Sequence, residues 1–203
     1  MVIIIDYNLG NLKSIANMIR KIGFDCIISN RKEDIEHSSR IILPGVGSFD
    51  YGMKNLQDLC LVDIIKKKAI IDKIPILGIC LGMQLLTKKS EEGSLPGLGL
   101  IEANTVKFNN EVALKVPHMG WNTIEPRRDS KLLDGMIEQE NRYYFVHSYC
   151  VKCEDKQDVV ATTQYGMEFV SIFEHENIMG VQFHPEKSHQ FGMKLLINFL
   201  ENY

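Results

Sequence analysis

A cysteine between two glycines has the surroundings in this chain that most favour chemistry. The segment Gly78-Ile79-Cys80-Leu81-Gly82 lies between an apolar run typical of a strand and a run with helical spacing. Flanking glycines let a chain turn sharply, as in the elbow that presents a nucleophile at the end of a strand. The start of the following helix favours a thiolate over a thiol. We therefore predict that Cys80 is a nucleophile; a buried structural cysteine beside turn glycines is the alternative.

A thiolate nucleophile needs a base, and His184 has the most suitable surroundings of the six histidines. In "GVQFHPE" (180–186) an apolar strand ends at His184, and Pro185 favours an extended conformation for it. Positions two apart in an extended chain face the same way, so Glu186 is expected to hold the His184 ring. A histidine at a strand end beside an unrelated surface glutamate is the alternative.

The segment "LPGVGSFD" (43–50) also follows a predicted strand. Its two glycines allow a peptide group to rotate until an N–H faces the site, as an oxyanion hole requires. We expect donors from the Val46–Gly47 turn and from the backbone N–H of Leu81. An ordinary tight turn between a strand and a helix is the alternative here.

The elements that must position these residues indicate an α/β fold with a central, mostly parallel sheet flanked by helices. Short, wholly apolar strands that alternate with helical patterns are typical of such sheets, whose sites lie at the carboxyl ends of the strands. The second half reads as a series of strands before a final helix, so it is β-rich. The predicted strands of the first half are 2–5, 25–29, 40–45 and 74–79, with helical patterns over 11–23 and from Gly52 to about Ile71.

Length and composition predict one domain over residues 1–203. A net charge of −3 without a basic stripe argues against nucleic-acid binding. The start "MVIIID" is unlike a signal peptide and no apolar run has the length of a membrane span, so we expect a cytoplasmic protein with reduced thiols. Cys150 and Cys153 lie three apart on a predicted strand and face opposite sides, which disfavours a metal or dithiol site.

Several motifs together resemble the triad-type (class I) glutamine amidotransferases, a family with a flavodoxin-like fold. Within it the chain is most similar to the glutaminase subunits of imidazole glycerol phosphate synthase. This resemblance implies that Cys80, His184 and Glu186 form a catalytic triad that hydrolyses glutamine through a γ-glutamyl thioester. It covers residues 6 to 188 and is carried by "DYNLGNLKSI", "LPGVGSFDYGM", "GICLGMQLL", "PHMGWN", "YYFVHSY" and "GVQFHPEKS".

The resemblance also implies a glutamine pocket, an oxyanion hole, a partner and no cofactor or metal. The partner would be a (β/α)8-barrel cyclase that takes up the ammonia and yields imidazole glycerol phosphate and AICAR, a step of histidine biosynthesis. We further hypothesise that the Gly45–Gly47 peptides rest with an N–H turned away and rotate when the partner is loaded. The residues implied are Val46, Gly47 and Leu81 for the oxyanion hole, Gly47, Gln84, Glu92, His147, Ser148 and Tyr149 for glutamine, and Asn11, Trp121, Tyr144 and Lys187 for the partner interface.

One position departs from the family pattern, because Asn8 replaces the first glycine of "DYGxGNL". Asparagine tolerates a positive φ better than most residues, so the turn can survive. This loop borders the side expected to face the partner, which leaves open a paralogous glutaminase that supplies ammonia for amidation of surface sugars. The sequence also leaves open a catalytically silent docking scaffold and a stand-alone hydrolase of γ-glutamyl peptides.

Overall fold

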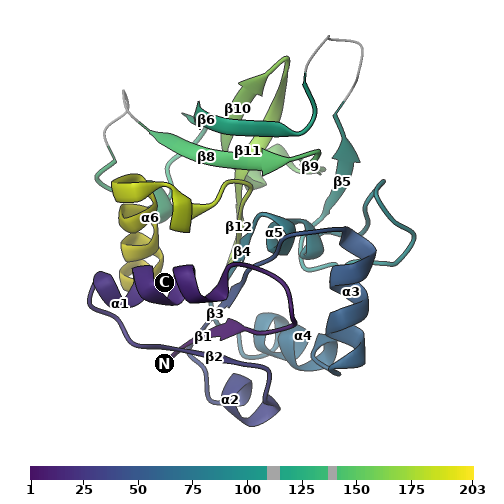
Figure 1. The fold of residues 1–203 in the computed structure, drawn as a ribbon, viewed down its shortest axis with the longest axis vertical. Helices are drawn as coiled ribbons and strands as arrows, with labels where there is room; N and C mark the ends of the chain where they lie inside the picture. Colours follow the sequence, from purple (N-terminus) through teal and green to yellow (C-terminus); the bar gives the residue numbers. More distant parts are fainter. Residues whose placement is uncertain (109–114, 137–140) are drawn as a thin grey trace.

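A mixed ten-stranded sheet forms the centre of the protein (Figure 1). The computed structural model describes residues 1–108, 115–136 and 141–203. Five neighbouring strands are parallel to one another, and the strands beyond β12 are antiparallel. The parallel strands, in spatial order, are β2 (Cys26–Ser29), β1 (Val2–Ile5), β3 (Arg40–Leu43), β4 (Ile76–Ile79) and β12 (Ile178–Val181). The predicted α/β class with a β-rich second half is therefore confirmed.

The antiparallel half and a separate ribbon come from the second half of the chain. The ribbon pairs β6 (His118–Thr123) with β8 (Arg142–His147), and it lies at the top of the view in Figure 1. The remaining strands of the large sheet are β11 (Met167–His175), β10 (Val159–Tyr165), β7 (Glu125–Pro126), β9 (Tyr149–Cys153) and β5 (Ala103–Lys107).

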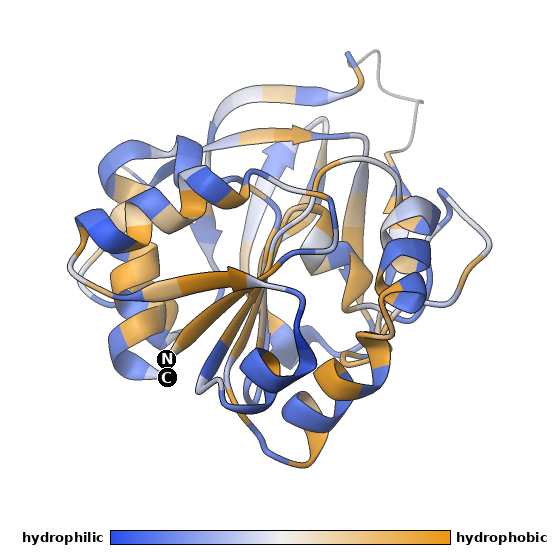
Figure 2. Cartoon of the chain, turned by 60° about the horizontal axis from the view of Figure 1, so that its bottom comes forward, coloured by the Kyte–Doolittle hydropathy of each residue, from blue (hydrophilic) through white to orange (hydrophobic). Residues whose placement is uncertain are grey.

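Helices cover both faces of the parallel strands, which explains why those strands are apolar along their whole length. In β1, for example, Val2 and Ile4 enter one core and Ile3 and Ile5 enter the other. Figure 2 shows apolar strands between helices that carry polar residues on their outer surfaces. One face is covered by α1 (Leu12–Lys21) and α6 (His189–Asn202), the other by α2 (Lys32–Glu36), α3 (Phe49–Asp58), α4 (Val62–Ile70) and α5 (Leu81–Leu85).

Two predicted elements are each divided in the structure. The single helix expected from Gly52 to about Ile71 is wrong, because Cys60 adopts φ = 53° and separates α3 from α4. The apolar and aromatic run "RYYFVHSYCVK" (142–152), which reads as one strand in the sequence, is divided at Ser148, where the chain leaves the ribbon and enters the large sheet as β9. This change of sheet places residues 147–149 at a bend beside the end of β4.

Short 3-10 turns complete the chain: η1 (Lys131–Leu133), η2 (Lys156–Asp158) and η3 (Pro185–Lys187). The last of these follows β12 directly and precedes α6. Across the three described ranges, we find no helix with the length and apolar character needed to cross a membrane.

Candidate active site

Cys80 occupies a strained corner between β4 and α5. Its backbone has φ = 54° and ψ = −109°, a conformation that side-chain-bearing residues rarely adopt. The flanking glycines are required by packing, since a Cβ on Gly82 would lie 1.8 Å from the carbonyl oxygen of Leu43. A Cβ on Gly78 would likewise lie 2.7 Å from the Cα of Met83. The sequence thus forms the sharp turn that presents the thiol at the carboxyl end of the parallel strands.

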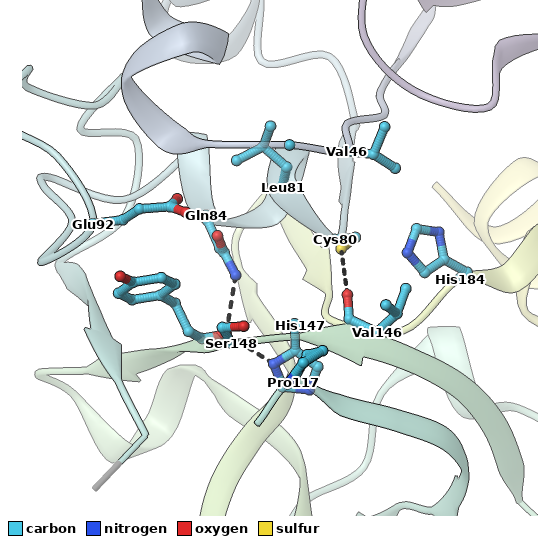
Figure 3. A pocket seen from close by; sticks show the side chains of 12 residues that line it. Val46, Cys80, Leu81, Gln84, Glu92, Pro117, Val146, His147, Ser148 and His184 are labelled. Carbon is cyan, nitrogen blue, oxygen red and sulfur yellow. Dashed lines mark hydrogen bonds between the residues drawn. The ribbon is translucent and has the colours of Figure 1, made fainter. Parts of the chain in front are cut away.

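The Cys80 sulfur lies among polar groups from two other segments, the end of β8 and the chain that follows β12. Its Sγ is 3.9 Å from the carbonyl oxygen of Val146 and 3.8 Å from Nε2 of Gln182. The ring of His184 lies beside the sulfur (Figure 3). Although the residue is buried, the sulfur borders an open cavity. The corner therefore supplies an accessible thiol rather than a cysteine enclosed in the apolar core.

His184 and Glu186 form a buried pair next to this thiol. Nδ1 of His184 lies 2.9 Å from Oε1 of Glu186, and the two side chains are only 2% and 1% exposed. Glu186 reaches the ring through the 3-10 turn η3 and not along extended chain, so the contact was predicted for the wrong reason. Nε2 of His184 makes no hydrogen bond to any described residue and is free to exchange a proton with the thiol.

The electrostatics of this pair favour a charged imidazole. Burial lowers the pKa of His184, but the neighbouring Cys80 and Glu186 outweigh burial and raise it to about 9. An imidazolium between a carboxylate and a sulfur stabilises a thiolate, the form of cysteine that attacks carbonyl carbons. The arrangement can therefore hold a nucleophile, a proton carrier and a carboxylate that orients the carrier.

The predicted oxyanion turn follows β3 and lies beside Cys80. The N–H of Leu81 donates to the carbonyl oxygen of Gly45, with an N···O distance of 3.4 Å. Because a trans peptide holds its C=O and N–H on opposite sides, the N–H of Val46 points away from Leu81. A Cβ on Gly45 would lie 2.3 Å from the Tyr7 hydroxyl, so only glycine fits there.

A cavity of about 290 Å³ brings together all six residues predicted to bind glutamine. In Figure 3 the thiol and His184 lie toward one end of it, and Gln84 and Glu92 lie toward the other. Such a volume fits a small polar molecule. The walls are Val46, Gly47, Cys80, Leu81, Gln84, Glu92, Pro117, Val146, His147, Ser148, Tyr149 and His184.

Gln84 and Glu92 have fixed orientations in this cavity. Nε2 of Gln84 donates to the carbonyl oxygen of Tyr149 and to Oε1 of Gln182, at 3.1 Å each, so its own oxygen remains available. Oε2 of Glu92 accepts the backbone N–H of Phe49 at 2.8 Å, at the first turn of α3. The other carboxylate oxygen of Glu92 makes no hydrogen bond to any described residue.

His147 uses both ring nitrogens within the protein. Nδ1 lies 2.8 Å from the carbonyl oxygen of Tyr149, and Nε2 lies 3.1 Å from Nδ1 of His118. Burial lowers the pKa of His147 to about 3 and that of His118 to about 4, so both rings are neutral. With both ring nitrogens in use and the ring neutral, His147 belongs to the pocket wall and does not compete with His184 as a base.

Three of the four residues predicted to face a partner lie together on the surface. The ring centroids of Tyr144 and Trp121 are 6.3 Å apart across the ribbon. Nζ of Lys187 lies 5.5 Å from the centroid of the Tyr144 ring. Trp121 is 45% exposed, which is unusual for a large aromatic side chain. Asn11 precedes α1, which packs against η3, the turn that contains Lys187.

Sequence reasoning missed Gln182, which contacts both Cys80 and Gln84. It lies two residues before His184 and its side chain is fully buried. A glutamine inside an apolar strand is the signal that could have identified it, because buried carboxamides are retained where their hydrogen bonds are satisfied. His118 lies within "PHMGWN", and no local pattern there indicates its contact with His147.

Sequence comparisons identify relatives along the whole chain. A family model described as "Glutamine amidotransferase class-I" matches residues 3–203. "Imidazole glycerol phosphate synthase subunit HisH 2" of Methanococcus maripaludis is 58% identical over 201 residues, with 99% of each chain covered. The protein of the same name from Pseudomonas aeruginosa is 45% identical, again with 99% of each chain covered.

Solved structures with low sequence identity share the fold. The structure of PurLQS from Thermotoga maritima matches with a TM-score of 0.73 and 19% identity, over 99% of this chain and 97% of that one. A glutamine amidotransferase from Thermotoga maritima matches with a TM-score of 0.65 and 20% identity, over 100% of this chain and 81% of that one.

Proposed function

Because the chain belongs to the class I glutamine amidotransferase family, we propose that it is the glutaminase subunit of an imidazole glycerol phosphate synthase, a single amidotransferase domain over 1–203. One observation carries the chemistry: a thiol on a strained corner lies beside a buried histidine that a buried glutamate orients. We assign Cys80, His184 and Glu186 as the catalytic triad on this ground.

In the proposed reaction the Cys80 thiolate attacks the side-chain amide carbon of glutamine. The C–S bond forms, and protonated His184 gives its proton to the amide nitrogen, which leaves as ammonia. Water then attacks the γ-glutamyl thioester, with His184 as the base, and glutamate and the thiol are released. Glu186 keeps its charge and holds the imidazole in the orientation that both steps need.

The polar groups of the cavity match the two ends of a glutamine molecule. The free oxygen of Gln84 and the free carboxylate oxygen of Glu92 suit the α-ammonium group. The backbone from His147 to Tyr149 lies at the bend of the chain where it can donate to the α-carboxylate. This pose places the side-chain amide next to Cys80, because the thiol lies toward the other end of the cavity from Glu92 (Figure 3).

The oxyanion turn fits a resting state that is switched off. With the Gly45 carbonyl aimed at the Leu81 N–H, one expected donor is occupied and the other is turned away. An oxygen that carries negative charge would then lack donors, and each missing donor costs about 3 kcal/mol of transition-state stabilisation. We propose that the Gly45–Val46 peptide rotates when a loaded partner binds, which frees Leu81 and directs the Val46 N–H into the cavity.

The partner is proposed to be a (β/α)8-barrel cyclase that consumes the ammonia. Ammonia released into water is mostly protonated, so it must pass directly to a second active site. The exposed Trp121, with Tyr144 and Lys187 beside it, supports a docking surface next to the triad. Asn11 is assigned to the same surface by its place before α1.

A second candidate is a paralogous glutaminase whose barrel partner amidates a surface sugar. One observation favours it: Asn8, with φ = 65°, stands where the family pattern has glycine, in the loop that borders the side expected to face the partner. The catalytically silent scaffold is disfavoured because Cys80, His184 and Glu186 are all present. The stand-alone hydrolase of γ-glutamyl peptides is disfavoured because it gives no reason for the exposed aromatic surface around Trp121.

The first experiment measures glutamate release from glutamine by the chain alone, with a histidine-pathway barrel cyclase, and with cyclase and nucleotide together. Strong stimulation by cyclase and nucleotide supports the proposal. Lack of stimulation, with Cys80 still labelled by a glutamine-like alkylating agent, favours the sugar-modifying partner instead. Cys80→Ala should abolish glutamine use while leaving partner binding and turnover with added ammonia intact; turnover of glutamine by this variant would contradict the assignment.

A further inference from the structure

A series of hydrogen bonds between buried carboxamides ends at the Cys80 sulfur. The carbonyl oxygen of Tyr149 accepts from Nε2 of Gln84, and the same nitrogen donates to Oε1 of Gln182. Nε2 of Gln182 then points to Sγ of Cys80 across 3.8 Å, a distance at which N–H groups donate to sulfur. The Gln182 side chain is fully buried and Gln84 is 5% exposed, so water does not compete with these contacts.

The direction of each carboxamide in this series follows from its neighbours. A backbone carbonyl can only accept, and that of Tyr149 also receives Nδ1 of His147. Gln84 must therefore present its NH₂ group to Tyr149, and its second N–H reaches Gln182. Gln182 must in turn present its oxygen to Gln84 and its NH₂ group to the sulfur. A flipped Gln84 would place its oxygen against the carbonyl oxygen of Tyr149, and a flipped Gln182 would place its NH₂ group against that of Gln84.

The other groups around the Cys80 sulfur do little to stabilise its thiolate form, so a hydrogen-bond donor matters here. The helix that follows Cys80 has only five residues, so the favourable field at its N-terminus is weak. The carbonyl oxygen of Val146 lies 3.9 Å from Sγ and presents its negative end to the sulfur, which disfavours a thiolate. Among the described residues, the donor groups that face Sγ are the ring of His184 and the carboxamide of Gln182.

We propose that Gln182 is a further catalytic residue, whose carboxamide N–H donates to the Cys80 sulfur and favours the thiolate. A hydrogen bond to the charged form of a group stabilises that form. The same bond holds Sγ at the mouth of β4, between His184 and the cavity. Because Gln84 and the backbone of Tyr149 border the glutamine site, the donor is held by the groups that receive the substrate. This inference rests on the proposed function of Cys80.

Two substitutions separate the donor role from mere packing. Gln182→Met keeps the length and apolar stem but removes the N–H group. Gln182→Glu keeps the acceptor for Gln84 but places a carboxylate beside the sulfur, so like charges meet when the thiolate forms. The pH midpoint of Cys80 alkylation should rise by about one unit in Gln182→Met, the shift expected when one hydrogen bond to the charged form is lost. It should rise further in Gln182→Glu.

The experiment follows alkylation of the full chain by iodoacetamide as a function of pH. Mass spectrometry of tryptic peptide 74–88, in which Cys80 is the one cysteine, separates its reaction from that of exposed Cys60. Gln57→Met, at an exposed position of α3, is the matched control and should leave the midpoint unchanged. Equal midpoints in wild type, Gln182→Met and Gln182→Glu would overturn the proposal.

A measurement on the unaltered protein keeps the proposal testable if the variants fold poorly. The side-chain amide signals of Gln182, observed by nuclear magnetic resonance, should titrate with the midpoint found for Cys80 alkylation. Signals that do not respond to pH or to alkylation of Cys80 would contradict the contact. Failure of the proposed function is recognised separately, because wild type and Cys80→Ala would then release glutamate from glutamine at the same rate, whatever the midpoints are.

Discussion

At the scale of single residues, buried charge determines how the triad behaves. The side chains of His184 and Glu186 are both almost fully buried. The cost of burying each charge is offset by the opposite charge of the other side chain. Oε2 of Glu186 has no hydrogen-bond partner among the described residues, so Glu186 interacts mainly with the ring of His184. The raised pKa of His184 is the consequence, since both the carboxylate and the sulfur favour imidazolium.

Glu186→Gln should lower kcat/KM for glutamine by about 10³- to 10⁴-fold, as loss of the orienting carboxylate does in other triads. The carboxamide neither stabilises imidazolium nor fixes the ring orientation as a carboxylate does. The measurement is glutamate release by the complex with its barrel partner and nucleotide. Glu201→Gln, near the end of α6 and exposed, is the matched control. A loss of less than tenfold would remove Glu186 from the triad.

The three residues of the proposed triad could be singled out in the sequence because each lies within a short motif. Cys80, His184 and Glu186 belong to two segments whose glycines, proline and spacing have a local physical meaning. Gln182 and His118 were missed because their roles exist only after distant segments meet: Gln182 contacts Gln84 across 98 positions and His118 contacts His147 across 29. No local pattern carries that information.

At the scale of elements, the loop that carries Glu92 is fastened to the start of α3. The Asp50 carboxylate accepts the backbone N–H groups of Ser94 at 2.9 Å and Leu95 at 3.0 Å, and these bonds lower its pKa. A Cβ on Gly93 would lie 1.9 Å from the carboxylate, so glycine lets the loop approach this closely. Glu92 therefore owes its position to Asp50 as well as to the N–H of Phe49.

Asp50→Asn should raise KM for glutamine by roughly tenfold, since the hydrogen bonds to a charged acceptor are weakened and Glu92 is held less firmly. We expect a smaller effect on kcat, because Cys80 and His184 are on other elements. The measurement is the glutamine dependence of glutamate release by the stimulated complex. Asp58→Asn, at the exposed end of the same helix, should leave KM unchanged. If kcat falls while KM is unchanged, Asp50 has no role in glutamine binding.

The elements themselves could be predicted where local pattern and burial agree. The parallel strands read as continuous apolar runs because both of their faces are covered. The structure has β1, β2, β3 and β4 within two residues of the predicted bounds, whereas β12 ends at Val181, three residues before the predicted end at His184. The break between α3 and α4 has no such signature, because Cys60 adopts a positive φ without being glycine. The division of β8 from β9 at Ser148 was hidden because alternation continues on both sides, although the strands join different sheets.

At the scale of the whole molecule, three buried histidines oppose one another in the pH dependence of folding. The pKa of His184 is raised to about 9. Its contribution to the free energy of unfolding is therefore fully present below about pH 6.5, the pKa of an unperturbed histidine, and is lost as the pH rises through 9. His118 and His147 have pKa values lowered to about 4 and 3, so their rings stay neutral in the fold. Their contribution is present above about pH 6.5 and is lost as the pH falls.

The free energy of unfolding should therefore be largest near pH 6.5 and fall on both sides. Between pH 6 and 4 the unfolded chain takes up two more protons at His118 and His147, which costs about 1.4 kcal/mol for each proton and pH unit. Urea unfolding across pH measures this slope. His118→Phe keeps the stacking on Phe145 and Tyr165 and should reduce the histidine part of the slope by half, whatever it does to overall stability. The exposed His37→Asn is the control, and an unchanged slope in His118→Phe would show that His118 is already charged in the folded protein.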